Sequence, residues 1–119
     1  MPERKYPPPR RRAPRVVVIL SAYPRRADAE RAARALVRAR VLACATVTPT
    51  GRAYYRWGGK ERADPSALLW GKTTGARARA AVSAIRDSHP DRVPEILILP
   101  AQGGHAPYLA WIEGEVRRR

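Results

Sequence analysis

The first hydrophobic stretch of the chain is a continuous run, and the next follows a helical spacing. Residues 16–20 (VVVIL) are apolar and mostly β-branched, which is typical of a strand covered on both faces. Pro24 ends this strand. Within residues 27–40 the apolar positions recur at helical spacing, at Ala29, Ala32, Ala33, Leu36 and Val37. The pattern therefore predicts a strand at 16–20 and a helix at 27–40.

A long stretch of small, β-branched and aromatic residues follows, with a glycine pair at 58–59. Residues 42–50 (LACATVTPT) are typical of a strand, and residues 52–60 (RAYYRWGGK) continue as an aromatic strand into a tight turn. Residues 61–74 then run back, with Pro65 marking a bulge or an edge. Together these segments predict one long, bent hairpin.

A second helix, a strand and a closing helix complete the pattern. The helix is predicted to begin at residue 74 or 75 and to end at His89, because the residue before Pro90 avoids the helical region. Residues 95–100 (EILILP) predict a strand, and residues 107–116 predict a short helix. This order is that of the ferredoxin-like α+β fold (β-α-β-β-α-β), an antiparallel sheet with both helices on one face, here with a C-terminal helix.

The aromatic residues of the predicted hairpin are difficult to accommodate in a monomer. The two helices cover one face of the sheet, so the hairpin would leave a broad apolar patch exposed, formed by Tyr54, Tyr55, Trp57 and Trp70. Soluble monomers rarely expose a patch of this size. We therefore expect the chain to oligomerise through this sheet.

Charge is spread unevenly along the 119 residues. The chain has 24 basic and 10 acidic residues, a net charge of +14. Residues 1–15 contribute +5 and residues 117–119 contribute +3, so we expect a disordered, basic, Pro-rich arm at 1–15, a folded domain at 16–116 and a basic tail at 117–119. Such tails bind polyanions loosely through counterion release. A polyanion- or RNA-binding module driven by the tails is therefore one functional hypothesis.

Other features of the sequence narrow the class of protein. The longest apolar run has five residues, far below the roughly 20 that span a bilayer, and no signal-peptide pattern precedes residue 16. The single Cys44 cannot form an intrachain disulfide or a Cys-only zinc site, and its small neighbours favour a buried, hydrophobic role. We expect a cytoplasmic protein that does not interact with membranes.

Several different short motifs follow one another along the chain, each of which occurs once. They are residues 42–46 (LACAT), 55–60 (YRWGGK), 72–74 (KTT), 89–90 (HP), 94–96 (PEI), 99–100 (LP) and 108–111 (YLAW). In this order and spacing they resemble the CutA-type divalent-cation tolerance proteins, over residues 16 to about 116. The resemblance implies a homotrimer whose hairpins join neighbouring sheets, and tolerance of divalent metals with binding of copper. The architecture is also similar to the PII signalling proteins, trimers that bind small ligands between subunits.

The resemblance also implies a metal site near the end of the second helix. Copper-binding members can carry a cysteine at the end of the first strand and two consecutive histidines before the proline, where this chain has Ser21 and Ser88-His89. We predict a weak site for a divalent metal, copper among the candidates, with His89 as the imidazole ligand and Asp91 and Glu95 as carboxylates. Copper(I), which prefers sulfur, fits this set poorly. Capping of the helix end is the alternative role of His89.

Four further residues are candidates for ligand contact. Lys60 and Lys72 place charges beside a packed sheet. One interpretation is that they bind an anionic or metal-bound small ligand, and the other is that they form structural ion pairs. Tyr55 and Trp57 lie among basic residues, an arrangement that fits base stacking or, as we favour, subunit packing.

These observations predict a CutA-like trimer that binds divalent metal in response to metal ions and catalyses no reaction. A PII-like trimer that binds a small ligand is the alternative. Specific nucleic-acid binding is not expected, because residues 67–73 lack the aromatic signature of RNA-recognition domains. Hydrolysis of acyl phosphates is not expected either, because no loop of the sequence is suited to cradle a phosphate.

Overall fold

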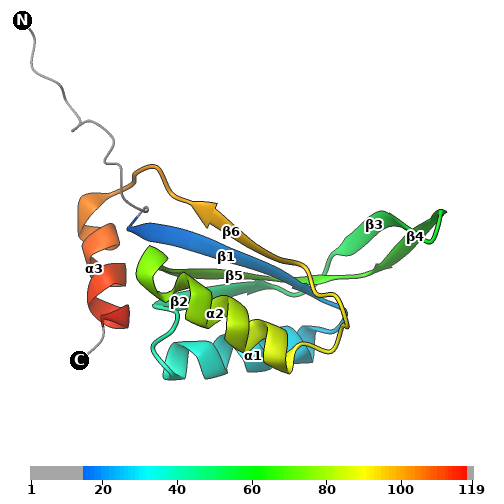
Figure 1. Ribbon diagram of the computed structural model, residues 1–119, viewed down its shortest axis with the longest axis horizontal. Coiled ribbons are helices and arrows are strands. Elements are labelled where there is room, and N and C mark those ends of the chain that lie inside the picture. The colour runs from blue at the N-terminus through cyan, green and yellow to red at the C-terminus, as the bar shows by residue number, and fades with distance from the viewer. Residues whose placement is uncertain (1–14, 118–119) are drawn as a thin grey trace, which may run out of the picture.

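The computed structural model describes residues 15–117, so nearly all of the predicted arm and tail lies outside it. The elements, in chain order, are β1 (Val16–Tyr23), α1 (Arg26–Arg38), β2 (Cys44–Thr48), β3 (Arg52–Trp57), β4 (Lys60–Pro65), β5 (Ala67–Thr74), α2 (Gly75–Ser88), β6 (Ile96–Pro100) and α3 (Ala106–Val116) (Figure 1). The order, the antiparallel sheet and the closing helix confirm the predicted α+β fold.

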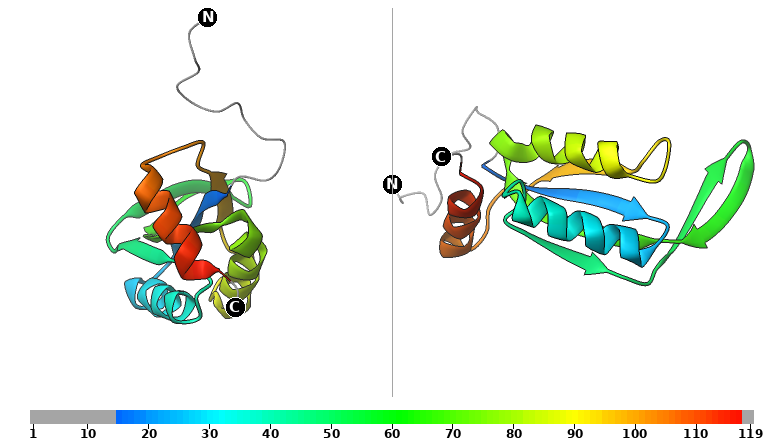
Figure 2. Two further views of the ribbon diagram at one scale, coloured as in Figure 1. Left: turned by 90° about the vertical axis from the view of Figure 1, so that its left-hand side faces the viewer. Right: turned by 90° about the horizontal axis from the view of Figure 1, so that it is seen from below.

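The main sheet has four strands in the order β2-β5-β1-β6, and every neighbouring pair is antiparallel. The apolar β1 lies in its interior, as its run of β-branched residues predicts. Both α1 and α2 lie on the same face of this sheet, and α3 lies across one end (Figure 2). The other face, which we call the open face, has no helix over it.

The long hairpin is bent where β2 and β5 pass into a separate ribbon formed by β3 and β4. This ribbon projects from the body of the molecule (Figure 1), and the bend agrees with the long, bent hairpin predicted from the sequence. At the bend the Ser66 amide donates to the Gly51 carbonyl at 3.0 Å, and a Cβ atom on Gly51 would lie 2.8 Å from the Ser66 carbonyl oxygen. Glycine is therefore required at 51. At the tip, Gly58 and Gly59 have φ angles of 62° and 77°, the left-handed pair that a two-residue hairpin turn needs.

The main core lies between the sheet and the two helices. Its members include Ile19, Leu36, Leu69 and Ile85, all at most 5% exposed. A second cluster forms under α3, where Ile112 and Val116 pack against Val16 and Ala43. Between them the two clusters bury one face of the sheet and one end of it, and leave the open face as surface.

The open face is lined by alternate residues of each strand. In β5, Ala67, Leu69, Gly71 and Thr73 are buried toward the helices, while the residues between them are half-buried on the open face. The strand register places Cys44, Thr46, Val18, Leu20, Leu97 and Leu99 beside them. Leu97 is 49% exposed and Leu99 is 41% exposed, so this face is both apolar and uncovered in a single chain.

Over residues 15–117, no helix is long and apolar enough to cross a membrane.

Candidate functional site

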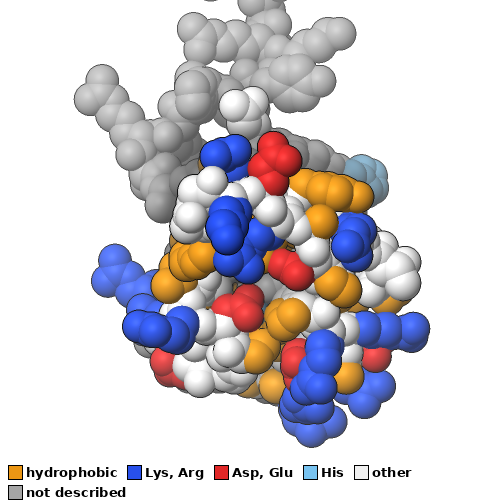
Figure 3. Space-filling view, turned by 90° about the vertical axis from the view of Figure 1, so that its right-hand side faces the viewer, with side chains coloured by type: hydrophobic (Ala, Val, Ile, Leu, Met, Phe, Trp, Pro, Cys, Tyr) orange, Lys and Arg blue, Asp and Glu red, His pale blue; other side chains and the backbone are white. Residues whose placement is uncertain are grey.

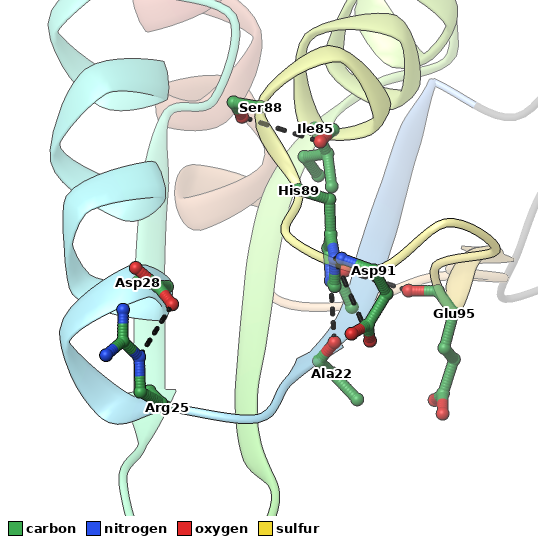
Figure 4. A network of polar contacts seen from close by, with 9 residues as sticks. Ala22, Arg25, Asp28, Ile85, Ser88, His89, Asp91 and Glu95 are labelled. Atoms are coloured by element: carbon green, nitrogen blue, oxygen red, sulfur yellow. Dashed lines mark hydrogen bonds and ion pairs between the residues drawn. The ribbon is translucent and has the colours of Figure 1, made fainter.

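His89 follows the last residue of α2 and points into the protein, toward the end of β1 (Figure 4). Its side chain is fully buried. Nε2 donates to the Ala22 carbonyl oxygen at 2.8 Å, and Nδ1 accepts from the Asp91 backbone N–H at 3.0 Å. The ring also stacks on Tyr23, with centroids 4.2 Å apart. Both ring nitrogens are therefore engaged, and the imidazole joins the end of α2 to β1 as the neutral Nε2–H tautomer.

Ser21 lies at the same junction. Its buried hydroxyl donates to the Glu95 carbonyl oxygen at 2.8 Å and holds the segment that leads into β6. The nearby Tyr23 hydroxyl is buried without a hydrogen-bond partner among the described residues. Burial is the main reason that the pKa of Tyr23 is raised above 10.0.

The two predicted carboxylate ligands, Asp91 and Glu95, differ in their position relative to the His89 ring. The Asp91 carboxylate is 3.9 Å from His89 Nδ1 and is half-exposed. The Glu95 side chain points away from the imidazole into solvent (Figure 4). The structure thus brings Asp91 to His89 but leaves Glu95 apart. Within the described part of the chain, no group of three or more His, Cys, Asp and Glu side chains is placed to hold a metal ion.

A carboxylate that the sequence analysis missed lies at the base of the hairpin. The Tyr55 hydroxyl donates to Asp64, its diagonal neighbour across the β3–β4 ribbon. Acceptance of this hydrogen bond by Asp64 is the main cause that raises the pKa of Tyr55, and the negative charge of Asp91 acts in the same direction. Asp64 and Asp91 therefore act on the same tyrosine from distant parts of the chain. The diagonal pairing is visible in the sequence once the 58–59 turn is placed, but the approach of Asp91 is not.

The remaining candidates do not form one cluster. Trp57 and Lys60 pair beside the turn at the hairpin tip, and both are exposed. Lys72 lies on the open face, where its Nζ donates to the Trp70 carbonyl oxygen at 3.1 Å and to Thr46 Oγ1 at 3.4 Å. It forms no ion pair with a carboxylate of residues 15–117. An amine on an apolar surface without a counter-ion favours an anionic partner.

Cys44 is opposite Lys72 in the strand register and is only half-buried, so the expectation of a buried thiol was wrong. The reason is that Cys44 lies on the open face. Its Sγ is 3.5 Å from the Tyr108 hydroxyl, and this contact is the main cause that raises the pKa of Tyr108.

This thiol also bears on the fit of copper. Lys72 pairs with Val18 and Leu68 pairs with Ala22, so Cys44 and His89 lie about 13 Å apart along the strands. Because Cys44 is the chain's only cysteine, His89 has no thiol beside it from its own chain. The residues around His89 therefore do not fit copper(I).

Comparisons with known proteins agree with the fold and with the motifs. Residues 17–115 match the family model of the CutA1 divalent ion tolerance proteins. The divalent-cation tolerance protein CutA of Pectobacterium atrosepticum is 35% identical over 101 residues, which cover 85% of this chain and 92% of that protein. The protein of the same name from Salmonella newport is 32% identical over 104 residues, covering 87% and 90%.

Solved structures extend the agreement to three dimensions. CutA from Xylella fastidiosa superposes with a TM-score of 0.82 at 35% identity, covering 85% of this chain and 97% of that one. CutA1 from Oryza sativa superposes with a TM-score of 0.84 at 27% identity, covering 90% and 98%. The resemblance carried by the motifs is confirmed, and the chain belongs to the CutA1 family of divalent ion tolerance proteins.

Proposed function

We propose that this protein supports tolerance of divalent cations as a homotrimer, in which neighbouring subunits cover the open face and the hairpin. The observation that supports assembly is the exposed apolar surface of Leu97 and Leu99 on the edge strand β6, together with Trp57 on the ribbon. A soluble monomer would carry this surface and an unpaired sheet edge at a cost in solubility. A partner chain removes both.

We propose further that a divalent metal binds at the base of the hairpin, with Asp91 and Asp64 as oxygen ligands. The proposal is supported by the hydrogen bond from the Tyr55 hydroxyl to Asp64 and by the charge of Asp91, which also raises the pKa of Tyr55. Oxygen donors suit hard or borderline divalent ions, whereas copper(I) prefers sulfur. Two carboxylates do not fill a coordination sphere, so water or a neighbouring subunit supplies the rest. In this arrangement His89 keeps its structural bonds and positions Asp91 through the backbone N–H.

The test is calorimetric titration of the metal-free, full-length protein with zinc, copper(II) and manganese. Wild type is compared with Asp91→Asn and Asp64→Asn. The control is Asp87→Asn, which removes an exposed carboxylate from α2. We expect saturable binding that weakens about tenfold or more in the first two variants and stays unchanged in the control. Equal metal binding by all four proteins would contradict a metal site formed by Asp91 and Asp64.

A PII-like ligand trimer remains the second candidate, and Lys72 favours it. The amine has no carboxylate partner among the described residues and lies on the face that assembly would cover. Titration with inorganic phosphate, comparing wild type with Lys72→Met, tests for an anion site there. Saturable binding that is lost in the variant would support this candidate.

Three further expectations belong to the proposal. The chain's relatives are named as tolerance proteins rather than as enzymes, and we assign no catalytic residue. Trp57 and Lys60, at the exposed hairpin tip, are proposed as contacts to a neighbouring subunit. A cytoplasmic location stays a prediction, because one solved structure of similar fold, from Archaeoglobus fulgidus, is described as periplasmic.

A further inference from the structure

The outer face of α1 carries a row of arginines. Its inner face is buried against the sheet through Ala29, Ala32, Ala33 and Leu36. Arg31, Arg34 and Arg38 follow one another at spacings of three and four residues on the opposite side, and all three are exposed. We call these three residues the α1 arginine row. It extends about 10.5 Å along the helix axis.

The positive charge of the described chain is concentrated in the layer that contains this row. The helical segments 25–40 and 75–88 hold nine arginines and three carboxylates, a net charge of +6. The other described residues hold eight basic and six acidic groups, a net charge of +2. Figure 3 shows a group of Lys and Arg side chains at the lower right, on the side where α1 lies in Figure 1, and others at the left and over the upper part of this face.

The few carboxylates of this layer already have partners. Asp28 accepts from Arg25 and Arg31, and Glu30 accepts from Arg26 at 3.0 Å. Arg34 and Arg38 pair with no carboxylate of residues 15–117. A shallow hollow also runs along the row, lined by Ala27, Glu30, Arg31, Arg34, Ala35 and Arg38. Small alanines between long guanidinium side chains give an anion room to approach.

The chemistry of the row fits a line of phosphate groups. Guanidinium binds phosphate with two parallel hydrogen bonds. One nucleic-acid strand advances about 3.4 Å per phosphate, so the row spans about three phosphates of a duplex strand. Among residues 15–117 the exposed aromatic side chains belong to the hairpin and α3, and α1 and α2 contribute none. Without aromatic side chains the surface offers single-stranded bases nothing to stack on.

The same composition argues against a lipid surface. Amphipathic helices that bind membranes expose large apolar side chains next to their basic ones, and insert them below the headgroups. Here most of the apolar face of α1 is buried in the core, and the exposed apolar residues beside the row are the small Ala27 and Ala35 and one larger side chain, Val37, which is 38% exposed.

We propose that the α1 arginine row binds the phosphate backbone of double-stranded nucleic acid without reading its sequence. The surface belongs to the folded domain and is separate from the basic ends of the chain. It faces away from the open face, so it stays accessible whether or not the chain assembles, and assembly would multiply it. The proposal does not depend on metal binding at the hairpin.

The experiment measures binding of the full-length protein to a fluorescein-labelled 20-base-pair DNA duplex, and to an RNA duplex of the same sequence, by anisotropy at several salt concentrations. The test variant is Arg31→Ala/Arg34→Ala/Arg38→Ala. The control is Arg10→Ala/Arg11→Ala/Arg12→Ala, which removes the same charge from the N-terminal segment. Alanine favours helix, and circular dichroism checks that both variants fold.

We expect the row variant to bind at least about tenfold more weakly than the control near 100 mM salt. Its plot of log affinity against log salt should be shallower than that of wild type by about 1.8 to 2.7, the values for two or three lost phosphate contacts, because Arg31 also donates to Asp28. Substitution of the same residues by lysine should preserve most of the salt slope.

Two results would overturn the proposal. One is binding that survives in the row variant and disappears in the control, which would assign it to the N-terminal segment. The other is that the wild-type protein does not bind either duplex. Wild type is also tested with vesicles that contain about one-third phosphatidylserine, and binding to these vesicles alone would assign the row to a lipid surface instead.

Discussion

Nε2 of His89 donates a hydrogen bond to the carbonyl oxygen of Ala22 across 67 positions of sequence, at 2.8 Å and with the ring fully buried. The bond fixes where α2 ends relative to β1. It also fixes the start of the loop that carries Asp91 toward the hairpin, so a structural histidine positions the carboxylate of the proposed metal site.

Replacement of His89 by alanine should therefore reduce stability strongly. The change leaves the Ala22 carbonyl without a donor and opens a cavity beside Tyr23, so we expect a loss of about 2–4 kcal/mol. Urea unfolding followed by circular dichroism measures it. The control is His105→Ala, an exposed histidine of the loop before α3, which should cost less than about 0.5 kcal/mol. Equal effects would deny His89 its structural role.

Asp28 should make stability depend on acid pH. Its hydrogen bond from Arg31 is the main cause that lowers its pKa below 3.8. A pKa that is lower in the folded state means that the stabilisation is complete above the unfolded value and is lost as the pH falls through the folded one. The difference in unfolding midpoint between wild type and Asp28→Asn should thus be constant from pH 7 to about 5. It should disappear as the pH falls below 3.8. A difference that persists under strongly acidic conditions would contradict this, and Asp87→Asn provides the comparison.

The bend of the hairpin should not tolerate a side chain at position 51. A Cβ atom there would lie 2.8 Å from the backbone oxygen of Ser66, so Gly51→Ala should cost about 1–3 kcal/mol and change the angle of the ribbon. Gly103→Ala is the matched control, because no atom lies within 4 Å of its added Cβ. Thermal unfolding of the two variants side by side measures the difference. Identical midpoints would show that the bend accepts the extra atom.

Charges on the edge strand should separate the subunits. Leu97→Glu/Leu99→Glu places two carboxylates on the open face, and we expect light scattering to report the mass of one chain where wild type reports three. Val93→Glu, in the exposed loop before β6, should leave the mass unchanged. A wild-type mass of about 13.3 kDa at micromolar concentration would itself contradict the proposed trimer.

The fold was readable from the sequence because its signals are local. The alanine spacing of α1, the run of β-branched residues in β1 and the 58–59 glycine turn each specify an element without reference to distant residues. The break of the hairpin was less visible. It depends on the contact between Gly51 and Ser66, and the sequence shows only a glycine near a proline.

The candidate site was only partly predictable, since its geometry arises from long-range packing. The pairing of Tyr55 with Asp64 follows from strand register, but the position of Asp91 depends on how the His89 ring is buried. No local sequence pattern reveals that both ring nitrogens of His89 form hydrogen bonds with backbone groups. Glu95 illustrates the same point, because its backbone oxygen is engaged by Ser21 while its carboxylate faces solvent.

The projecting β3–β4 ribbon has one further consequence. A two-stranded ribbon with both ends of its strands tied to the body but no core of its own is only marginally stable in water. Its amide protons should then exchange with deuterium rapidly in dilute protein and slowly at concentrations where chains associate, while those of β1 and β5 stay protected throughout. Exchange in the ribbon therefore reports assembly, and mass spectrometry reads it from the incorporated deuterium without a dye or tag attached to the protein.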